Sequence, residues 1–154
     1  MKIRILSSDD VRQALPMETA IEGMKLAFSR FSSGRVEMPL RSRVHVPEQE
    51  GVLLTMPAAI PDDGEMAVKI VTVFGTNPAR GFPLIHAAVL VLDADNGQVK
   101  ALMDGEVLTA VRTGAGVGVA TDLLAPSDAV TVAIIGSGKQ AFSQLDAVCT
   151  VRSI

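Results

Sequence analysis

The stretch Ala129–Ala141, which reads AVTVAIIGSGKQA, decides how the rest of the chain is interpreted. Its first half is a short apolar run, typical of a strand that is buried on both faces. Its second half has the form G-x-G-x-x-A, where the glycines make a tight turn and let backbone approach a pyrophosphate. A strand over 130–135 and a helix from about Lys139 therefore predict the first βα unit of a dinucleotide-binding domain. The alternative is a tight strand-to-helix turn that binds no ligand.

Other phosphate-binding patterns fit this stretch less well. A Walker A loop needs glycine at 133 and Ser or Thr at 140, whereas this chain has Ala133 and Gln140. In a dinucleotide domain the acidic residue that binds the ribose follows ~20 residues after the glycines. Because Ile154 comes before that second strand, we expect these residues to be the front part of a longer polypeptide.

Composition limits the classes of function that remain. The net charge is −3 and there is no Trp or Tyr, so neither a basic patch nor an aromatic platform supports nucleic-acid binding. No metal-ligand pattern is present, and Cys149 is expected to be a small buried side chain. The first ten residues lack the apolar core of a signal peptide, and the apolar runs are too short to span a bilayer. We expect a cytoplasmic protein without a membrane partner.

Hydrophobic periodicity predicts an α+β order of elements before the glycine motif. Helices are expected to begin at Ser7 or Ser8 and at Pro16, and a longer one to end before Pro126. Asp95-Asn96-Gly97 is typical of a type I′ hairpin turn. Strands are predicted over 3–6, 39–46, 51–58, 65–74, 85–92 and 98–103.

Five basic side chains stand out on these predicted strands. Arg41, Arg43 and His45 share one strand face, and the simplest interpretation is a solvated surface. Lys69 shares an apolar face of 65–74, so its ammonium group reaches water, pairs with an acid, or binds an anionic ligand. His86 is interpreted as a structural histidine, because nothing nearby forms a metal or triad pattern.

The predicted helix before Pro126 contains three glycines, each of which costs about 1 kcal/mol in a helix interior. Gly114 and Gly118 share one face of this helix. This spacing predicts close approach of another backbone to that face.

Several short motifs, in collinear order, resemble the ornithine cyclodeaminase/mu-crystallin family. The combination of M-D-G, T-A-x-R-T and the glycine loop is specific. The matching segments are Pro39-Leu40-Arg41, Met56-Pro57, Ala67-Val68-Lys69, Leu102-Met103-Asp104-Gly105, Thr109-Ala110-Val111-Arg112-Thr113 and Gly136-x-Gly138-x-x-Ala141.

This resemblance implies a homodimer with two domains in each chain. Residues 1–125 correspond to an α+β substrate-binding and dimerisation domain, and 126–154 to the start of an α/β Rossmann domain for NAD or NADP. Arg41, Lys69 and Arg112 match the three cations that bind the substrate carboxylate, and a catalytic aspartate is expected beyond Ile154. The pyrophosphate loop matches Gly136, Ser137, Gly138, Lys139 and Gln140.

The implied chemistry is hydride transfer at the Cα–N bond of an amino acid or cyclic imino acid. Ketimine reductases, amino acid dehydrogenases and ornithine cyclodeaminases share it. Leu54 stands where ornithine-acting members carry glutamate, which favours a reductase or dehydrogenase. The alternative is a mu-crystallin-like protein that binds NADPH and a small ligand without turnover. We predict that the 154-residue chain alone is inactive, because half of the cofactor site is missing.

Overall fold

The structure, a computed structural model, describes residues 2–154 and divides into two compact units. The first unit contains the N-terminal residues up to Asp9 together with Ser33–Glu106. The second contains Asp10–Ser32 and Val107–Ile154. The domain boundary predicted at residue 126 was drawn by family resemblance and stays a prediction.

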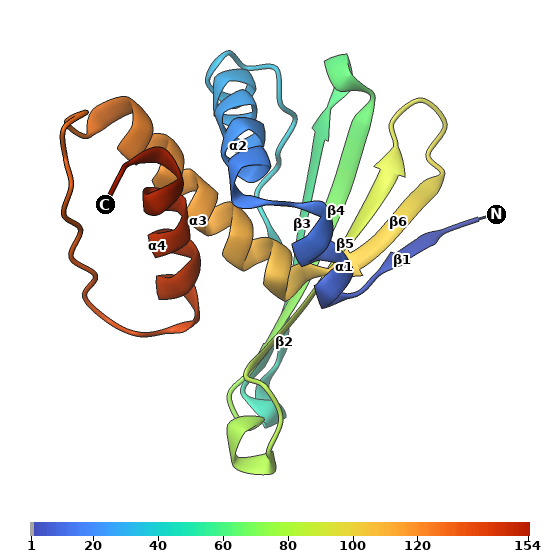
Figure 1. Cartoon of the computed structure of the whole chain (residues 1–154). Coiled ribbons are helices and arrows are strands. Elements are labelled where there is room, and N and C mark those ends of the chain that lie inside the picture. The colour runs from blue at the N-terminus through green and yellow to red at the C-terminus, as the bar shows by residue number, and fades with distance from the viewer. Residues whose placement is uncertain (1) are drawn as a thin grey trace. The chain divides into compact units, whose positions relative to one another are not determined.

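A single mixed sheet of six strands forms the first unit (Figure 1). The strand order is β1-β6-β5-β4-β3-β2, in which β1 pairs parallel with β6 and all other neighbours are antiparallel. Each strand lies within two or three residues of its predicted range. The strands are β1 Arg4–Leu6, β2 Ser42–Val46, β3 Gly51–Ile60, β4 Glu65–Phe74, β5 Ile85–Asp93 and β6 Val99–Asp104.

The two faces of this sheet differ in character. Lys69, Val71 and Val89 share one face, which we call the lysine face, and both valines are buried. The opposite face, here the open face, carries mainly apolar side chains, yet Ile5 is 74% exposed and Val44 is 58% exposed. Single exposed apolar residues are common on protein surfaces, but a contiguous apolar sheet face indicates a binding surface.

Within residues 2–154 there are four α-helices, besides three short 3-10 helices, and α2, α3 and α4 pack together in the second unit (Figure 1). A Cβ at Gly118 would lie 2.8 Å from Ile21 of α2, and one at Gly114 would lie 2.6 Å from the carbonyl carbon of Ser143 in α4. The predicted close approach at this glycine face is therefore confirmed. The helices are α1 Ser8–Ala14, α2 Met17–Ser32, α3 Gly105–Leu124 and α4 Lys139–Val151.

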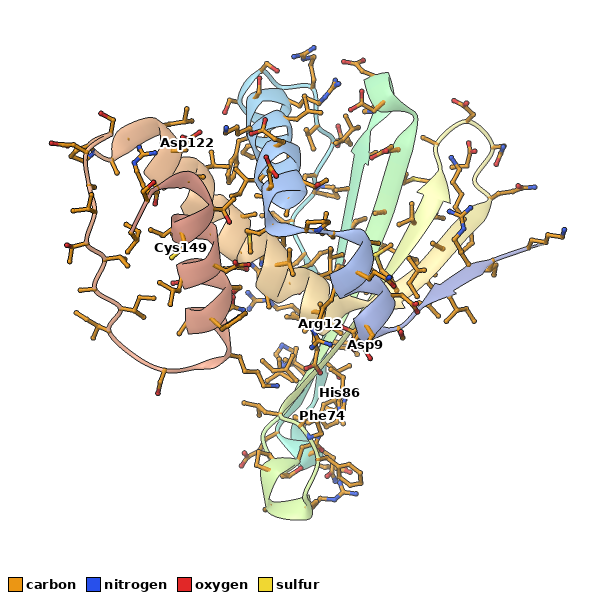
Figure 2. All side chains as sticks on the ribbon, viewed as in Figure 1. Asp9, Arg12, Phe74, His86, Asp122 and Cys149 are labelled. Carbon is orange, nitrogen blue, oxygen red and sulfur yellow. The ribbon has the colours of Figure 1, made fainter. Side chains whose placement is uncertain are left out.

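A network of charges stabilises the end of α3. Asp122, labelled in Figure 2, lies 2.8 Å from the Lys25 ammonium of α2, and its other carboxylate oxygen lies 3.5 Å from Arg152. Hydrogen bonding from Lys25 holds the pKa of Asp122 below its ordinary value, and the same bond raises the pKa of Lys25. Arg152 also donates to three carbonyls at the end of α3, those of Thr121, Asp122 and Ala125. The Asp122 and Ala125 carbonyls lie where a helix end leaves acceptors unpaired, whereas the Thr121 carbonyl also accepts from the Ala125 N–H.

The predicted strand over 130–135 is wrong, so the βα unit is not formed as expected. Residues 126–138 have no regular secondary structure, and Ile135 is fully exposed. A strand needs a neighbour to satisfy its backbone groups, and the sheet of the first unit does not include this segment. Only the helical half of the unit, α4, is present as predicted.

Three smaller expectations also fail. The loop after β5 is not a type I′ turn, because only Gly97 has a positive φ there and its N–H donates to the Asp93 carbonyl. Cys149 is exposed on α4 rather than buried (Figure 2). The α3 helix is long and apolar enough, by length and composition, to cross a membrane. Its glycine face packs against other helices within the second unit.

Candidate functional site

Two of the three predicted carboxylate-binding cations belong to the first unit, one just before β2 and one on β4. Met56 of β3 pairs directly with Lys69 of β4. Arg41 immediately precedes Ser42, the first residue of β2, and it lines the same recess as Arg43, whose partner Leu54 lies two residues from Met56 on β3. In the order β4-β3-β2, two strand spacings separate β4 from β2 by roughly 10 Å, so Arg41 at the start of β2 lies within reach of the face that carries Lys69. Two long basic side chains can therefore converge on one small anion.

Lys69 occupies the environment that its sequence pattern predicted. It is only partly exposed, and it stands on the lysine face between Ala67 and Val71. It takes part in an interaction within the described residues, so it is not an isolated charge. An ammonium group among apolar neighbours needs such compensation, and a bound carboxylate would add to it.

Arg112, the third predicted cation, belongs to the second unit. It is exposed on α3, two residues before the close approach at Gly114. A guanidinium presents a planar fork that matches the two oxygens of a carboxylate. The three predicted cations thus come from both units.

The glycine loop leads directly into α4, with Gly138 as the residue that precedes the helix. No side chain caps this helix start, and of the first-turn N–H groups that of Ala141 donates to the Gly138 carbonyl, which leaves those of Lys139 and Gln140 to face an anion. A Cβ at Gly136 or Gly138 would meet nothing within 4 Å, and the φ of 103° at Gly136 favours glycine. The residues present therefore fit a pyrophosphate, although strand 130–135 is not formed.

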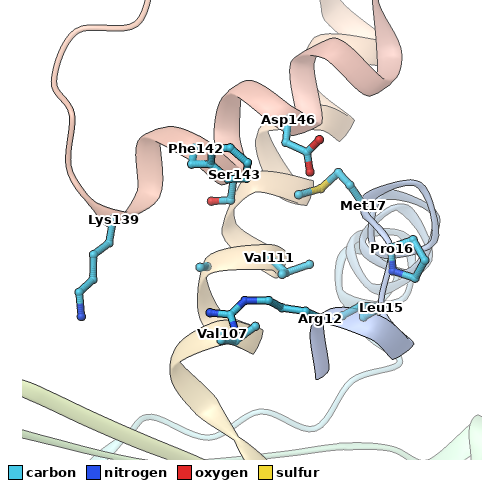
Figure 3. A pocket seen from close by; sticks show the side chains of 11 residues that line it. Arg12, Leu15, Pro16, Met17, Val107, Val111, Lys139, Phe142, Ser143 and Asp146 are labelled. Atoms are coloured by element: carbon cyan, nitrogen blue, oxygen red, sulfur yellow. The ribbon is translucent and has the colours of Figure 1, made fainter. Parts of the chain in front are cut away.

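A recess of about 370 Å³ lies beside the start of α4 within the second unit (Figure 3). Its lining combines Lys139 and Ser143 of α4 with Arg12 of α1 and Met17 of α2. Sequence reasoning did not find Arg12 or Met17, because more than a hundred residues separate them from the glycine loop and no motif includes them. No group of three or more His, Cys, Asp or Glu within residues 2–154 could hold a metal ion.

A glycine-rich loop that leads into a helix start is a common site for phosphate groups. The family profile described as "Ornithine cyclodeaminase/mu-crystallin family" matches residues 1–154. The chain belongs to the ornithine cyclodeaminase/mu-crystallin family.

Individual relatives are similar over nearly the whole chain. Delta(1)-pyrroline-2-carboxylate reductase of Bacillus cereus is 36% identical over 150 residues, which is 97% of this chain and 46% of that relative. The chain thus spans about half the length of the curated relatives it matches.

Two solved structures share the fold. The Thermococcus litoralis Delta(1)-pyrroline-2-carboxylate reductase, in complex with NADH and L-proline, has a TM-score of 0.88 and 39% identity, covering 98% of this chain and 47% of that one. An archaeal alanine dehydrogenase dimer with bound NAD has a TM-score of 0.90 and 31% identity, covering 100% of this chain and 47% of that one. The observed α+β sheet therefore corresponds to the architecture of these relatives.

Proposed function

We propose that this chain is the substrate-binding portion of an NAD(P)-dependent oxidoreductase acting at the Cα–N bond of an amino acid or cyclic imino acid. A ketimine reductase or an amino acid dehydrogenase fits best, because Leu54 offers no acid to bind a second amino group. The 154-residue chain is proposed to be inactive by itself, since it spans about half of its relatives.

The observation that carries this proposal is the position of Arg41, just before the first residue of β2, near the Met56–Lys69 pair of β3 and β4. Arg41 is exposed at the sheet edge, and Lys69 is half-buried among apolar residues. A carboxylate between them would neutralise both charges, while its apolar remainder lies along the sheet. This arrangement suits a small amino or imino acid.

The proposed roles follow from these positions. Arg41 and Lys69 hold the substrate carboxylate, with Arg112 as a third donor, so that the adjoining Cα–N bond has a fixed orientation. The N–H groups at the start of α4, from Gly138 onward, hold the cofactor pyrophosphate. A bound nicotinamide supplies or accepts hydride. In the reductive direction the imine carbon gains a hydride, and its nitrogen gains a proton from an acid not identified among these residues.

We also propose that the protein is a homodimer. The apolar open face of the sheet supports this, since Ile5 and Val44 would be covered by a second copy. One similar solved structure is described as a dimer. A cytoplasmic location is part of the same proposal.

A direct test uses the protein at its full natural length and follows NADH or NADPH oxidation with Δ1-pyrroline-2-carboxylate, and with pyruvate plus ammonium. Turnover of at least one substrate is expected. Arg112→Ala should raise KM by about 10-fold to 1000-fold, because a desolvated charge-assisted pair is lost. Arg35→Ala, which removes an exposed arginine bonded to Ser33, is the matched control.

Three results would contradict parts of this proposal. An unchanged KM in Arg112→Ala would remove Arg112 from the substrate site. Cofactor binding without turnover of any substrate would favour a ligand-binding protein. NADH oxidation by the isolated 154-residue chain would refute its proposed inactivity.

A further inference from the structure

A second recess, of about 500 Å³, follows the edge strand of the sheet within the first unit. Arg41, Arg43 and His45 line it from β2 and the residue before it. Val52 and Leu54 of β3 form its apolar lining, and the one acid that lines it is Glu50. Three basic side chains thus stand in a line on the face that also carries Lys69.

The strand register places Arg43 one step from the proposed carboxylate site. Arg43 pairs with Leu54, and Leu54 pairs with Val71, so this row is adjacent on the same face to the row of Met56 and Lys69. Two residues along a strand correspond to about 7 Å. Arg43 can therefore reach the far end of a small molecule whose first carboxylate lies beside Arg41.

The charges in this recess favour the binding of a second anionic group, in addition to the carboxylate proposed to bind Arg41 and Lys69. The guanidinium groups of Arg41 and Arg43 form no ion pair with any residue in 2–154. Like charges at successive positions on one strand face repel, and an anion between them relieves that repulsion. Leu54, directly opposite Arg43, supplies no carboxylate that would neutralise it.

We propose that the substrate carries a second carboxylate and that Arg43 is the specificity-determining residue that binds it. This inference rests on the proposed function, because it takes Arg41 and Lys69 as the site of the first carboxylate. The substrate class is then an amino dicarboxylate or the corresponding imine. Ketone and ammonium first lose water to give the imine; its carbon then accepts hydride and its nitrogen accepts a proton.

The test compares two substrates that differ only in the second carboxylate. Oxaloacetate plus ammonium and pyruvate plus ammonium are each assayed with NADH and the full-length protein. We expect kcat/KM to be at least about 10-fold higher for oxaloacetate. Arg43→Gln should lower kcat/KM for oxaloacetate by about 10-fold to 100-fold, through loss of a charge-assisted bidentate bond, and should leave the value for pyruvate unchanged.

Two control variants separate recognition from folding and net charge. Arg4→Gln removes the same charge from β1, at the opposite edge of the sheet, and should leave both substrates unaffected. Arg43→Lys keeps the charge but loses the planar fork, so it should restore part of the oxaloacetate activity.

Binding of succinate and propionate, measured by calorimetry, distinguishes failure of this inference from failure of the proposed function. Turnover of Δ1-pyrroline-2-carboxylate without any preference for oxaloacetate, together with succinate binding that Arg43→Gln does not weaken, would overturn this inference alone. Absence of all turnover would refute the proposed function. In that case Arg43-dependent succinate binding would still support the second carboxylate site, and its absence would overturn it.

Discussion

Replacing Gly114 with alanine is expected to force α3 and α4 apart, while the same change at Gly116 is expected to stabilise the protein. A Cβ at Gly114 would lie 2.6 Å from the carbonyl carbon of Ser143 and closer still to its oxygen. These are backbone atoms of α4, so no rotamer change relieves the overlap. At Gly116 the nearest atoms would be side-chain carbons of Phe28 and Met24, at 3.9 and 4.0 Å.

Two opposing effects determine how much each substitution changes the free energy of unfolding. Alanine gains about 1 kcal/mol over glycine at either helical position. Overpacking against an immovable neighbour costs about 1–3 kcal/mol or more, and this overlap lies at the severe end because backbone must shift. We expect Gly114→Ala to lose about 2 kcal/mol, whereas Gly116→Ala gains up to about 1 kcal/mol.

Thermal unfolding followed by circular dichroism measures this difference. For a chain of this size, 1 kcal/mol corresponds to about 2–4 °C in Tm. The two variants should thus differ by about 6–12 °C, with the unmodified protein between them. Gly23→Ala, on α2 with nothing within 4 Å of its Cβ, is a second stabilising control. Equal Tm values for Gly114→Ala and Gly116→Ala would refute the close helix contact.

Two further predictions concern the charge network at the end of α3. Arg152→Met removes the guanidinium donors from five backbone carbonyls, three of them at the end of α3, and we expect a loss of about 2 kcal/mol in unfolding free energy, measured in urea. An unchanged midpoint would contradict this expectation. For Asp122→Asn, the lowered pKa of Asp122 means that its contribution is present above pH 3.8 and is lost as pH falls through the folded-state pKa. The free energy of unfolding should fall more steeply below pH 3.8 in the unmodified protein than in this variant. If the two proteins lose stability in parallel as the pH falls, the ionised Asp122 carboxylate does not contribute to stability. The partner pKa of Lys25 is raised, so its contribution persists below pH 10.5 and is lost only at higher pH.

Most of the fold could be predicted from the sequence where one local pattern dominates. The strand β4 was predicted with its observed bounds, because Glu65–Phe74 is a mostly apolar run rich in β-branched residues and turn residues flank it. The close approach at Gly114 and Gly118 was also predictable, since two glycines four residues apart lie on one helix face and leave room there for a neighbouring backbone.

The rest depends on partners that a local pattern does not contain. Residues 130–135 have the composition of a buried strand, but a strand forms only beside another strand, and periodicity says nothing about the neighbour. The candidate site shows the same limit. Lys69 could be singled out from its own strand, because it is a charged residue among apolar neighbours. The role proposed for Arg43 depends on the strand register, which places Arg43 opposite Leu54.

The extended segment over 130–135 also affects how the protein behaves at high concentration. It is uncharged and rich in β-branched residues, it has no strand partner within residues 2–154, and Val130 is 66% exposed. Such a segment is a template for pairing between molecules, of the kind that leads to cross-β aggregates. Solubility of the 154-residue chain should therefore decline steeply with concentration, and a charged substitution at Val132 should delay precipitation.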